Sequence, residues 1–322
     1  MTHISLCHHK ISSLLPMLTL MLCLSLPSLA QNQVVKLWPG GVPASKDCPA
    51  YCERIMLRDN NPLKPRVQGV SDPTLEIFLP TTNIKKRAAV IICPGGAYKW
   101  LCIEEEGRHV AARLAERGFV ALVLKYRLPS DSIMTDPSFG PLSDALQAIR
   151  CTRSMAEQLD IDPNMVGIMG FSAGGHLAAS ASTLFDDERA SQYGNQTISA
   201  RPDFTVLGYP VISMVSEFSH ATTRTLLIGK VPDSDDMVQL FSAEKNIGVR
   251  TPPAFIFHAA DDNGVPCFGS LAYARELRRL GIPVDYHLFA FGGHGFGLGS
   301  DRRAGVWLDM FDLWFQDVIL KK

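Results

Sequence analysis

Apolar runs with strand character alternate with amphipathic segments along most of this chain, and that alternation limits the fold more than any other feature. The strand-like runs are residues 88–93, 120–124, 166–170, 204–208, 254–258 and 284–289. Helical spacing of apolar residues marks segments 107–117, 142–159, 172–184, 271–280 and 305–320. Runs that are apolar throughout are typical of parallel strands buried on both faces. We therefore predict an α/β fold with a mostly parallel central sheet and helices on both faces.

The length and the breaks in this alternation set the domain organisation. The 322 residues are 46% hydrophobic, which is enough for a large core, and one α/β domain can span this length. We expect a single domain over residues 31–322, with an outer strand at 74–79. Residues 211–249 interrupt the alternation and are expected to form a short cap insertion over the C-terminal edge of the sheet. Residues 31–65 are rich in Pro, Gly and Asn and are expected to contain few regular elements.

Residues 1–30 have the pattern of a secretory signal peptide. Lys10 precedes an apolar run from Leu14 to Leu26, and small residues at 28 and 30 suit a cleavage site. The run is shorter than the roughly 20 residues that a membrane-spanning helix needs. We expect cleavage after residue 30, a secreted or periplasmic protein, and no stable membrane span after cleavage. An uncleaved N-terminal anchor is the alternative.

Charge and cysteine spacing exclude several kinds of partner. The formal net charge is -1, and no basic stripe favours nucleic-acid binding. Cys48 and Cys52 lack the second ligand pair of a zinc site. Six cysteines follow residue 30, and an exported protein could oxidise them, but their spacing does not fix any pairing. They are Cys48, Cys52, Cys93, Cys102, Cys151 and Cys267. The oligomeric state is open at this stage.

The strongest local motif is Gly170-Phe171-Ser172-Ala173-Gly174. It fits G-x-S-x-G, a tight turn that follows a strand, precedes a helix and presents a serine above a sheet. Here an apolar strand precedes the turn and a helical pattern follows it. The amide groups at the start of that helix favour negative charge near the serine. Ser172 is therefore the predicted nucleophile, and a glycine-serine turn that only caps the helix is the alternative.

A serine nucleophile requires a base and an acid that orients the base. In folds with this turn the chain order is serine, acid, histidine, on loops after late strands. His294 lies between glycines after the strand that ends at Phe289, and Asp262 follows the strand that ends at His258. Asp261 is the competing acid. A structural hydrogen bond is expected for His176. The histidines that are weaker candidates for the base are His109, His176, His220, His258 and His287.

Ester and amide hydrolysis also requires donors for the oxyanion that forms on the carbonyl. The residue after the nucleophile, Ala173, supplies one N–H group in folds of this kind. Others come from the loop after an early buried strand, here residues 94–98. The small residues of that loop let the backbone approach a substrate. An ordinary Pro-Gly turn is the alternative.

Together these motifs make the sequence resemble the small secreted bacterial carbohydrate esterases of the α/β-hydrolase superfamily. Within it, the similarity is to the acetylxylan and feruloyl esterase group, which is related to hormone-sensitive-lipase-like esterases. The resemblance covers nearly all of residues 31–322. It is carried by residues 37–41, 71–75, 94–98, 126–128, 170–176, 209–211, 262–266 and 292–297.

The resemblance implies a role for each matching residue. Ser172 would be the nucleophile, His294 the base and Asp262 the acid, because the family's acid stands three residues before a Val-Pro pair. The family pattern makes the oxyanion donors Gly96, Ala97 and Ala173. The related enzymes need no metal and no cofactor. The sequence departs from related lipases at Pro94, where they have histidine, and Ala97 replaces a glycine, but neither change removes a backbone donor at the oxyanion positions.

The resulting hypothesis is a serine carboxylic-ester hydrolase that works through an acyl-enzyme. Its expected substrate is a small ester or an acylated oligo- or polysaccharide, with acetyl groups on xylan favoured by the family. Tyr98, Trp100 and Tyr209 are expected pocket walls, since aromatic faces suit sugar or aryl groups, although simple packing would explain them too. A peptidase of the prolyl-oligopeptidase type and a non-catalytic binding protein are the alternatives. The first would usually need an N-terminal propeller, for which about 60 residues are too few.

Overall fold

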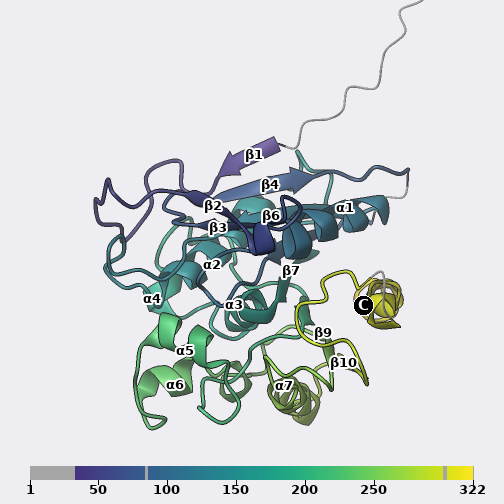
Figure 1. Ribbon diagram of the computed structural model, residues 1–322. Coiled ribbons are helices and arrows are strands. Elements are labelled where there is room, and N and C mark those ends of the chain that lie inside the picture. The colour runs from purple at the N-terminus through teal and green to yellow at the C-terminus, as the bar shows by residue number, and fades with distance from the viewer. Residues whose placement is uncertain (1–32, 84–85, 300–302, 322) are drawn as a thin grey trace, which may run out of the picture. The chain divides into compact units, whose positions relative to one another are not determined.

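A twisted, eight-stranded sheet forms the centre of the described part of the chain (Figure 1). The computed structural model describes residues 33–83, 86–299 and 303–321, so the expected signal peptide lies outside the described residues. The strand order is β1-β4-β6-β5-β7-β8-β9-β10. Strands β1 and β4 run antiparallel to their neighbours, and the strands from β6 to β10 are parallel. Their bounds are β1 Gln33–Lys36, β4 Thr74–Phe78, β5 Ala89–Cys93, β6 Val120–Lys125, β7 Val166–Phe171, β8 Thr205–Gly208, β9 Ala254–Ala259 and β10 Val284–Phe289.

Helices cover both faces of the sheet. Figure 1 shows α1 and the C-terminal helix α8 on one side, with α2 and α3 on the other. The longer helices are α1 His109–Glu116, α2 Gly140–Ser154, α3 Ser172–Thr183, α7 Phe268–Arg279 and α8 Trp307–Trp314. This arrangement confirms the predicted α/β-hydrolase fold, since strand order and crossovers leave the carboxyl ends of the parallel strands on one edge. In the described ranges no helix has the length and apolarity to cross a bilayer.

Aromatic packing fixes α8 on the sheet. Trp307 is fully buried and stacks on Phe257 of β9, with ring centroids 4.3 Å apart. Phe311 stacks on Phe119, which directly precedes β6, at 5.5 Å. Pairs of this kind contribute about 0.5–1.5 kcal/mol beyond the area they bury. The last helix is therefore held against the same strand that carries one of the predicted site loops.

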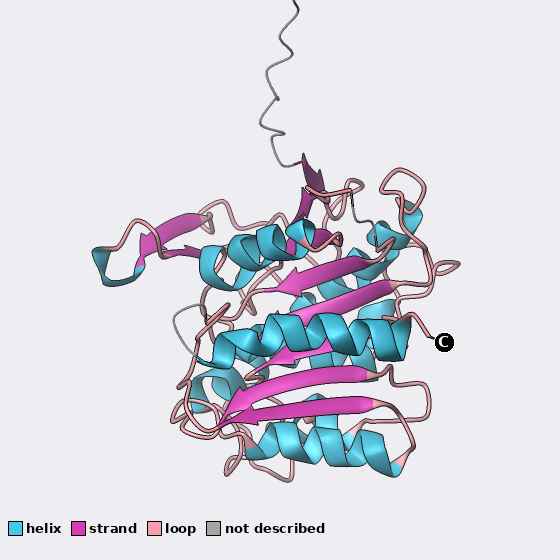
Figure 2. Cartoon of the chain, turned by 90° about the vertical axis from the view of Figure 1, so that its right-hand side faces the viewer, coloured by secondary structure: helices cyan, strands magenta, loops and turns pink. Residues whose placement is uncertain are grey.

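The N-terminal segment contains few regular elements, as expected, and those within residues 33–65 include β1, β2 and the start of β3. Strands β2 (Arg54–Leu57) and β3 (Pro65–Gln68) pair antiparallel and are joined by residues 58–64, which begin with a 3-10 helical turn at Arg58–Asn60. All four residues of β2 are exposed, so no alternation of buried and exposed positions marked it in the sequence. Figure 2 shows this hairpin projecting near the arrowheads of the parallel strands.

The segment between β8 and β9 contains two short helices, α5 (Ala221–Ile228) and α6 (Asp236–Phe241). It is tied to the rest of the chain by Ser138 Oγ, which donates to Leu227 O at 2.6 Å. A third short helix, α4 (Glu188–Ser191), precedes β8. All six cysteines of the described ranges are free thiols.

A buried ion pair joins the N-terminal segment to the core. The guanidinium of Arg127 and the carboxylate of Asp144 are 1% and 0% exposed, and Arg127 Nη2 lies 2.8 Å from Asp144 Oδ1. Asp144 also accepts from Trp38 Nε1 at 2.8 Å and from the backbone N–H of Arg127 at 2.9 Å. Because every one of these donors is desolvated, removing the carboxylate leaves an uncompensated buried cation.

We expect Asp144→Ala to lower the free energy of unfolding by about 3–5 kcal/mol, the usual cost of breaking a buried pair. Urea titration measures this change. The matched control is Asp72→Ala, which removes an exposed partner of Lys36 and is expected to cost less than about 1 kcal/mol. Equal losses in the two variants would contradict a special role for the buried pair.

Candidate active site

Four loops at the carboxyl ends of parallel strands carry all the predicted catalytic residues. The loop after β5 contains residues 94–98, Ser172 follows β7, Asp262 follows β9 and His294 follows β10. Parallel strands end at the same edge of the sheet, so residues far apart in the sequence meet there. The site is therefore a direct product of the sheet topology.

Ser172 occupies a strained turn between β7 and α3. Its backbone φ is 52°, in the left-handed region that non-glycine residues rarely adopt. The glycines on either side are required by close approach. A Cβ on Gly174 would lie 2.1 Å from Cys93 O, and a Cβ on Gly170 would lie 2.0 Å from Gly174 O. The motif thus packs the start of α3 directly against the ends of β5 and β7.

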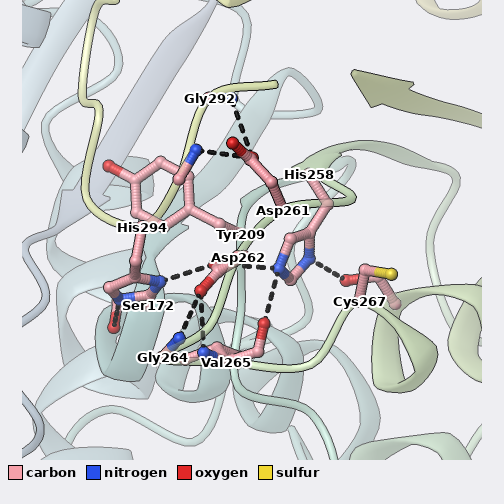
Figure 3. A network of polar contacts seen from close by, with 12 residues as sticks. Ser172, Tyr209, His258, Asp261, Asp262, Gly264, Val265, Cys267, Gly292 and His294 are labelled. Carbon is pink, nitrogen blue, oxygen red and sulfur yellow. Dashed lines mark hydrogen bonds and ion pairs between the residues drawn. The ribbon is translucent and has the colours of Figure 1, made fainter. Parts of the chain in front are cut away.

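A continuous hydrogen-bonded relay links the three predicted side chains (Figure 3). Ser172 Oγ lies 2.9 Å from His294 Nε2, and His294 Nδ1 lies 2.7 Å from Asp262 Oδ2. A carboxylate only accepts, so Nδ1 carries a proton and donates to Asp262. In the neutral ring Nε2 is then an acceptor for the serine hydroxyl. The arrangement can remove a proton from Ser172 and hold the resulting imidazolium.

Asp262 is held by four donors. Its Oδ1 accepts from the backbone N–H groups of Gly264 and Val265, each at 2.8 Å, and Oδ2 contacts His258 Nε2 at 3.2 Å as well as His294. Burial alone would raise the pKa of Asp262, but the hydrogen bonds from His258, His294 and the backbone outweigh it. The pKa of Asp262 is therefore well below its usual range, and the carboxylate is charged when it orients the imidazole.

His258, one of the weaker candidates for the base in the sequence, lies directly behind Asp262. It is fully buried, its Nδ1 contacts Ser270 Oγ at 2.9 Å, and its Nε2 lies 3.1 Å from Val265 O as well as near Asp262. It has no contact with Ser172, so it supports the acid and does not compete as the base. Its position four residues before Asp262, at the end of β9, is the signal that could have assigned this role.

Asp261, the competing acid, has a different function in the loop structure. Its Oδ1 accepts from the N–H groups of Gly292 and Gly293, at 2.9 and 2.7 Å. These glycines immediately precede His294. Neighbouring aspartates therefore fix the imidazole in two ways, one through the ring and the other through the backbone of its loop.

The loop after β5 presents backbone donors beside Ser172. Gly96 and Ala97 have positive φ values of 132° and 57°, and both line the cavity that contains Ser172. Within the described ranges, no group accepts a hydrogen bond from either N–H. Ala173 lies in the first turn of α3, where N–H groups have no partner inside the helix. These three amides are thus available for an anionic oxygen.

His176 makes the structural contacts expected of it. Its Nε2 donates to Phe241 O at 2.7 Å, and its Nδ1 accepts from the hydroxyl of Tyr98 at 3.0 Å. Burial lowers the pKa of His176 to about 4, so the ring is neutral. The hydrogen bond with Phe241 opposes this shift without reversing it. The contact anchors Tyr98, at the end of the loop after β5, to α3 and α6.

The cavity at Ser172 has a volume of about 460 Å³. Trp100 lines it, as predicted. Tyr98 and Tyr209 do not, and their prediction as pocket walls is wrong because both rings are buried beneath the loops. The other lining residues come from the hairpin, the loops and the insertion: Met56, Leu57, Arg58, Arg66, Gly96, Ala97, Cys102, Glu105, Glu106, His220, His294 and Gly295.

Sequence reasoning missed most of this lining. Arg58 belongs to the hairpin, whose strands were not expected, and His220 lies in the segment before α5. Glu106 follows the loop after β5 within a run of three glutamates, which carries no motif of its own. Each residue reaches the cavity through long-range folding, and local sequence pattern does not encode that position.

The sheet order and the serine–histidine–aspartate relay define this chain as an α/β-hydrolase. Comparison with protein families identifies the family of α/β-hydrolases to which the chain belongs. Residues 75–277, well over half of the chain, match the BD-FAE family. The chain therefore belongs to the BD-FAE family, which confirms the resemblance to carbohydrate esterases of the α/β-hydrolase superfamily.

Relatives of known name are esterases and xylan-related enzymes. Endo-1,4-beta-xylanase B of Butyrivibrio fibrisolvens is 35% identical over 73% of this chain and 36% of its own length. An acetylxylan esterase of Xylanibacter ruminicola is 34% identical over 75% of this chain and 46% of its own length. The chain thus spans less than half of either relative. Among solved structures, an acetyl ester-xyloside bifunctional hydrolase from Caldicellulosiruptor lactoaceticus matches with 33% identity and a TM-score of 0.72, covering 89% of this chain and 97% of that one.

The lowered pKa of Asp262 predicts an acid-sensitive contribution to stability. A lowered carboxyl pKa stabilises the fold at pH values above the ordinary pKa of 3.8, and this contribution is lost as the pH falls toward the folded-state pKa. The difference in free energy of unfolding between wild type and Asp262→Asn should therefore stay constant from about pH 6 to about pH 5 and shrink as the pH falls from there to about pH 2. Urea titrations across this range measure it. A difference that stays constant across the whole range would contradict a charged, stabilised carboxylate.

Proposed function

We propose that this chain is a serine carboxylic-ester hydrolase that removes acyl groups, acetyl above all, from xylan or related plant carbohydrates. The observation that carries the proposal is the relay from Asp262 through His294 to Ser172. Its serine and histidine line a cavity beside backbone amides that have no acceptor within the described ranges. A nucleophile, a base and oxyanion donors are the three parts that acyl transfer requires.

Acylation begins when His294 Nε2 takes the hydroxyl proton of Ser172 as Oγ attacks the ester carbonyl carbon. The carbonyl oxygen becomes an anion, and the N–H groups of Gly96, Ala97 and Ala173 are the donors in reach of it. The C–O bond to the alcohol then breaks, and the imidazolium returns its proton to the leaving oxygen. Asp262 stabilises the imidazolium throughout and is not itself protonated. The products of this half-reaction are the free alcohol and an acyl-serine.

Deacylation repeats these steps with water. His294 removes a proton from a water molecule, whose oxygen attacks the acyl carbon and regenerates the oxyanion. The bond from the acyl carbon to Ser172 Oγ then breaks, and the serine recovers its proton from His294. A carboxylic acid leaves, and the sequence of steps consumes one water for each ester. No redox or metal step is needed for this balance.

The character of the cavity supports a carbohydrate ester. Charged and polar side chains line it together with Trp100, Met56 and Leu57, and sugars combine hydroxyl groups with a flat apolar face. The names of the relatives point the same way, since one is an acetylxylan esterase and another a xylanase. We also propose that the chain is exported, because residues 1–30 have the pattern of a secretory signal.

Replacement of Ser172 tests the proposal directly. Ser172→Ala should fold like the wild type and lose at least about 10³-fold in kcat on p-nitrophenyl acetate, since removing a member of such a triad costs this much or more. Acetate release from acetylated xylan should fall in parallel, and ferulate release from feruloylated xylan measures the competing acyl preference. Unchanged turnover in the variant would refute the nucleophile.

Two assays on the wild-type protein distinguish an esterase from the two alternative classes of function. A peptidase would cleave aminoacyl p-nitroanilides, and we expect no such turnover by the wild type. A binding protein that has lost catalysis would fail to react with a fluorophosphonate probe, whereas we expect rapid labelling of Ser172. Either opposite result would replace esterase activity with the corresponding class.

His220 is placed to recognise the alcohol part of the substrate. Its Nδ1 lies 2.8 Å from Thr223 Oγ1 and accepts from Thr223 N at 3.4 Å, as an N-cap of α5. Burial lowers the pKa of His220, which favours the neutral ring. With Nδ1 as acceptor, the proton is on Nε2. Among the described residues this N–H has no partner, so it can donate to a sugar hydroxyl in the cavity.

We expect His220→Asn to raise KM for an acetylated xylo-oligosaccharide by about fivefold, the equivalent of one net hydrogen bond of about 1 kcal/mol. Asparagine is a good N-cap and preserves α5, but it is too short to replace the Nε2 donor. Turnover of p-nitrophenyl acetate, which has no sugar, serves as the internal control and should be nearly unchanged. Equal effects on both substrates would exclude sugar recognition by His220.

A further inference from the structure

Glu106 is a buried carboxylate that bridges two of the active-site loops. The residue is 4% exposed and lies in the helical turn Glu104–Arg108, which follows the loop after β5. Its Oε2 accepts from the backbone N–H of Gly95 at 2.8 Å, and its Oε1 accepts from the hydroxyl of Tyr209 at 2.9 Å. Gly95 immediately precedes Gly96, one of the proposed oxyanion donors.

Tyr209 extends this connection to the loop after β10, which carries His294. Its hydroxyl accepts from the backbone N–H of Gly297 at 2.9 Å, three residues after His294. Its ring also packs edge-on against the imidazole of His294, with centroids 5.2 Å apart, as the close-up in Figure 3 shows. The side chains of Glu106 and Tyr209 therefore form one chain of hydrogen bonds from Gly95 to Gly297.

Packing accounts for the ring of Tyr209, which contacts Phe171, Phe257 and Phe296, but it does not account for the hydroxyl of Tyr209 or the carboxylate of Glu106. Burial raises the pKa of Glu106, and the hydrogen bond from Tyr209, the charge of His294, the N–H of Gly95 and the charge of Arg66 oppose that effect only in part. The ion-pair partner of Arg66 is the neighbouring Glu105, not Glu106. An apolar residue would fill the same space without desolvating a carboxyl group. A buried polar bridge at this cost indicates that the positions of the loops matter.

We propose that Glu106 and Tyr209 are positioning residues. They hold the loop after β5 (residues 94–98) and the loop after β10, which carries His294, in a fixed position relative to one another. This inference rests on the proposed esterase function. The bridge fixes the backbone of Gly95, and hence the direction of the next amide, while fixing the backbone that carries His294. Charge on the carbonyl oxygen develops only in the transition state, so misplacement should lower kcat with little effect on KM.

Four variants test the bridge. Glu106→Ala removes both acceptors and should lower kcat by about 10- to 100-fold, since a misplacement of about 1 Å at a catalytic site can cost about 100-fold. Glu106→Gln can still accept from Gly95 and can donate to Tyr209, so it should lose only about threefold. Tyr209→Phe cuts the link to Gly297 and should lose about tenfold in kcat. Glu104→Gln is the matched control on the same turn, where the surface partner is Arg108, and it should behave as wild type.

Two further readouts distinguish positioning from general structural support. The rate constant for fluorophosphonate labelling of Ser172 should fall by the same factor as kcat, because the phosphonyl oxygen uses the same donors. The effects of Glu106→Ala and Tyr209→Phe should be strongly non-additive in the double variant, since both break one network. Thermal melting shows which variants are folded. If Glu106→Ala does not fold, Tyr209→Phe alone decides the question.

The proposal is overturned if a folded Glu106→Ala or Tyr209→Phe variant keeps wild-type kcat and labelling rate. It is equally overturned if Glu106→Gln is as impaired as Glu106→Ala, because charge and not positioning would then be required. Both results presuppose an active wild type whose activity is lost in Ser172→Ala. An inactive wild type would instead refute the esterase function, so the two failures are distinguishable.

Discussion

The hydrogen bond between His294 and Asp262 is the contact on which the site depends. It joins the loops after β9 and β10, fixes the proton of the imidazole on Nδ1 and leaves Nε2 to face Ser172. The bond is strong because Asp262 is already ordered by backbone amides and by His258. The parallel sheet supplies the rest, because it brings the ends of both strands to the edge where β7 presents the serine.

Local features that destabilise the fold gather at this edge. Ser172 has an unfavourable backbone conformation, which costs on the order of 1–3 kcal/mol, and the buried carboxyl group of Glu106 is desolvated nearby. The apolar strands and the aromatic packing of α8 offset these costs. Elsewhere the local sequence preferences agree with the fold. Backbone strain and buried polar groups that concentrate in one place are typical of functional sites.

The predictable part of the structure was the part written in periodic patterns and in the serine motif. Strands such as β5 and β7 are apolar throughout. Glycines at 170 and 174 predict a tight turn, in which the backbone approaches too closely for a Cβ atom. The hairpin was missed because the apolar side chains of β2 are exposed. Tyr209 was assigned to a pocket wall, but its place under the loops depends on contacts with residues about 90 to 100 positions away, which no local pattern encodes.

The central claim is that Ser172 becomes covalently acylated during turnover. Acid-quenching the wild type within the first turnover of p-nitrophenyl acetate, followed by peptide mass spectrometry, tests this most directly. We predict an acetyl group on the peptide that contains Ser172, present in larger amount in an Asp262→Asn variant if deacylation is slowed more than acylation. Continued turnover with the acetyl group on a different residue, or with none at any time point, would contradict the account.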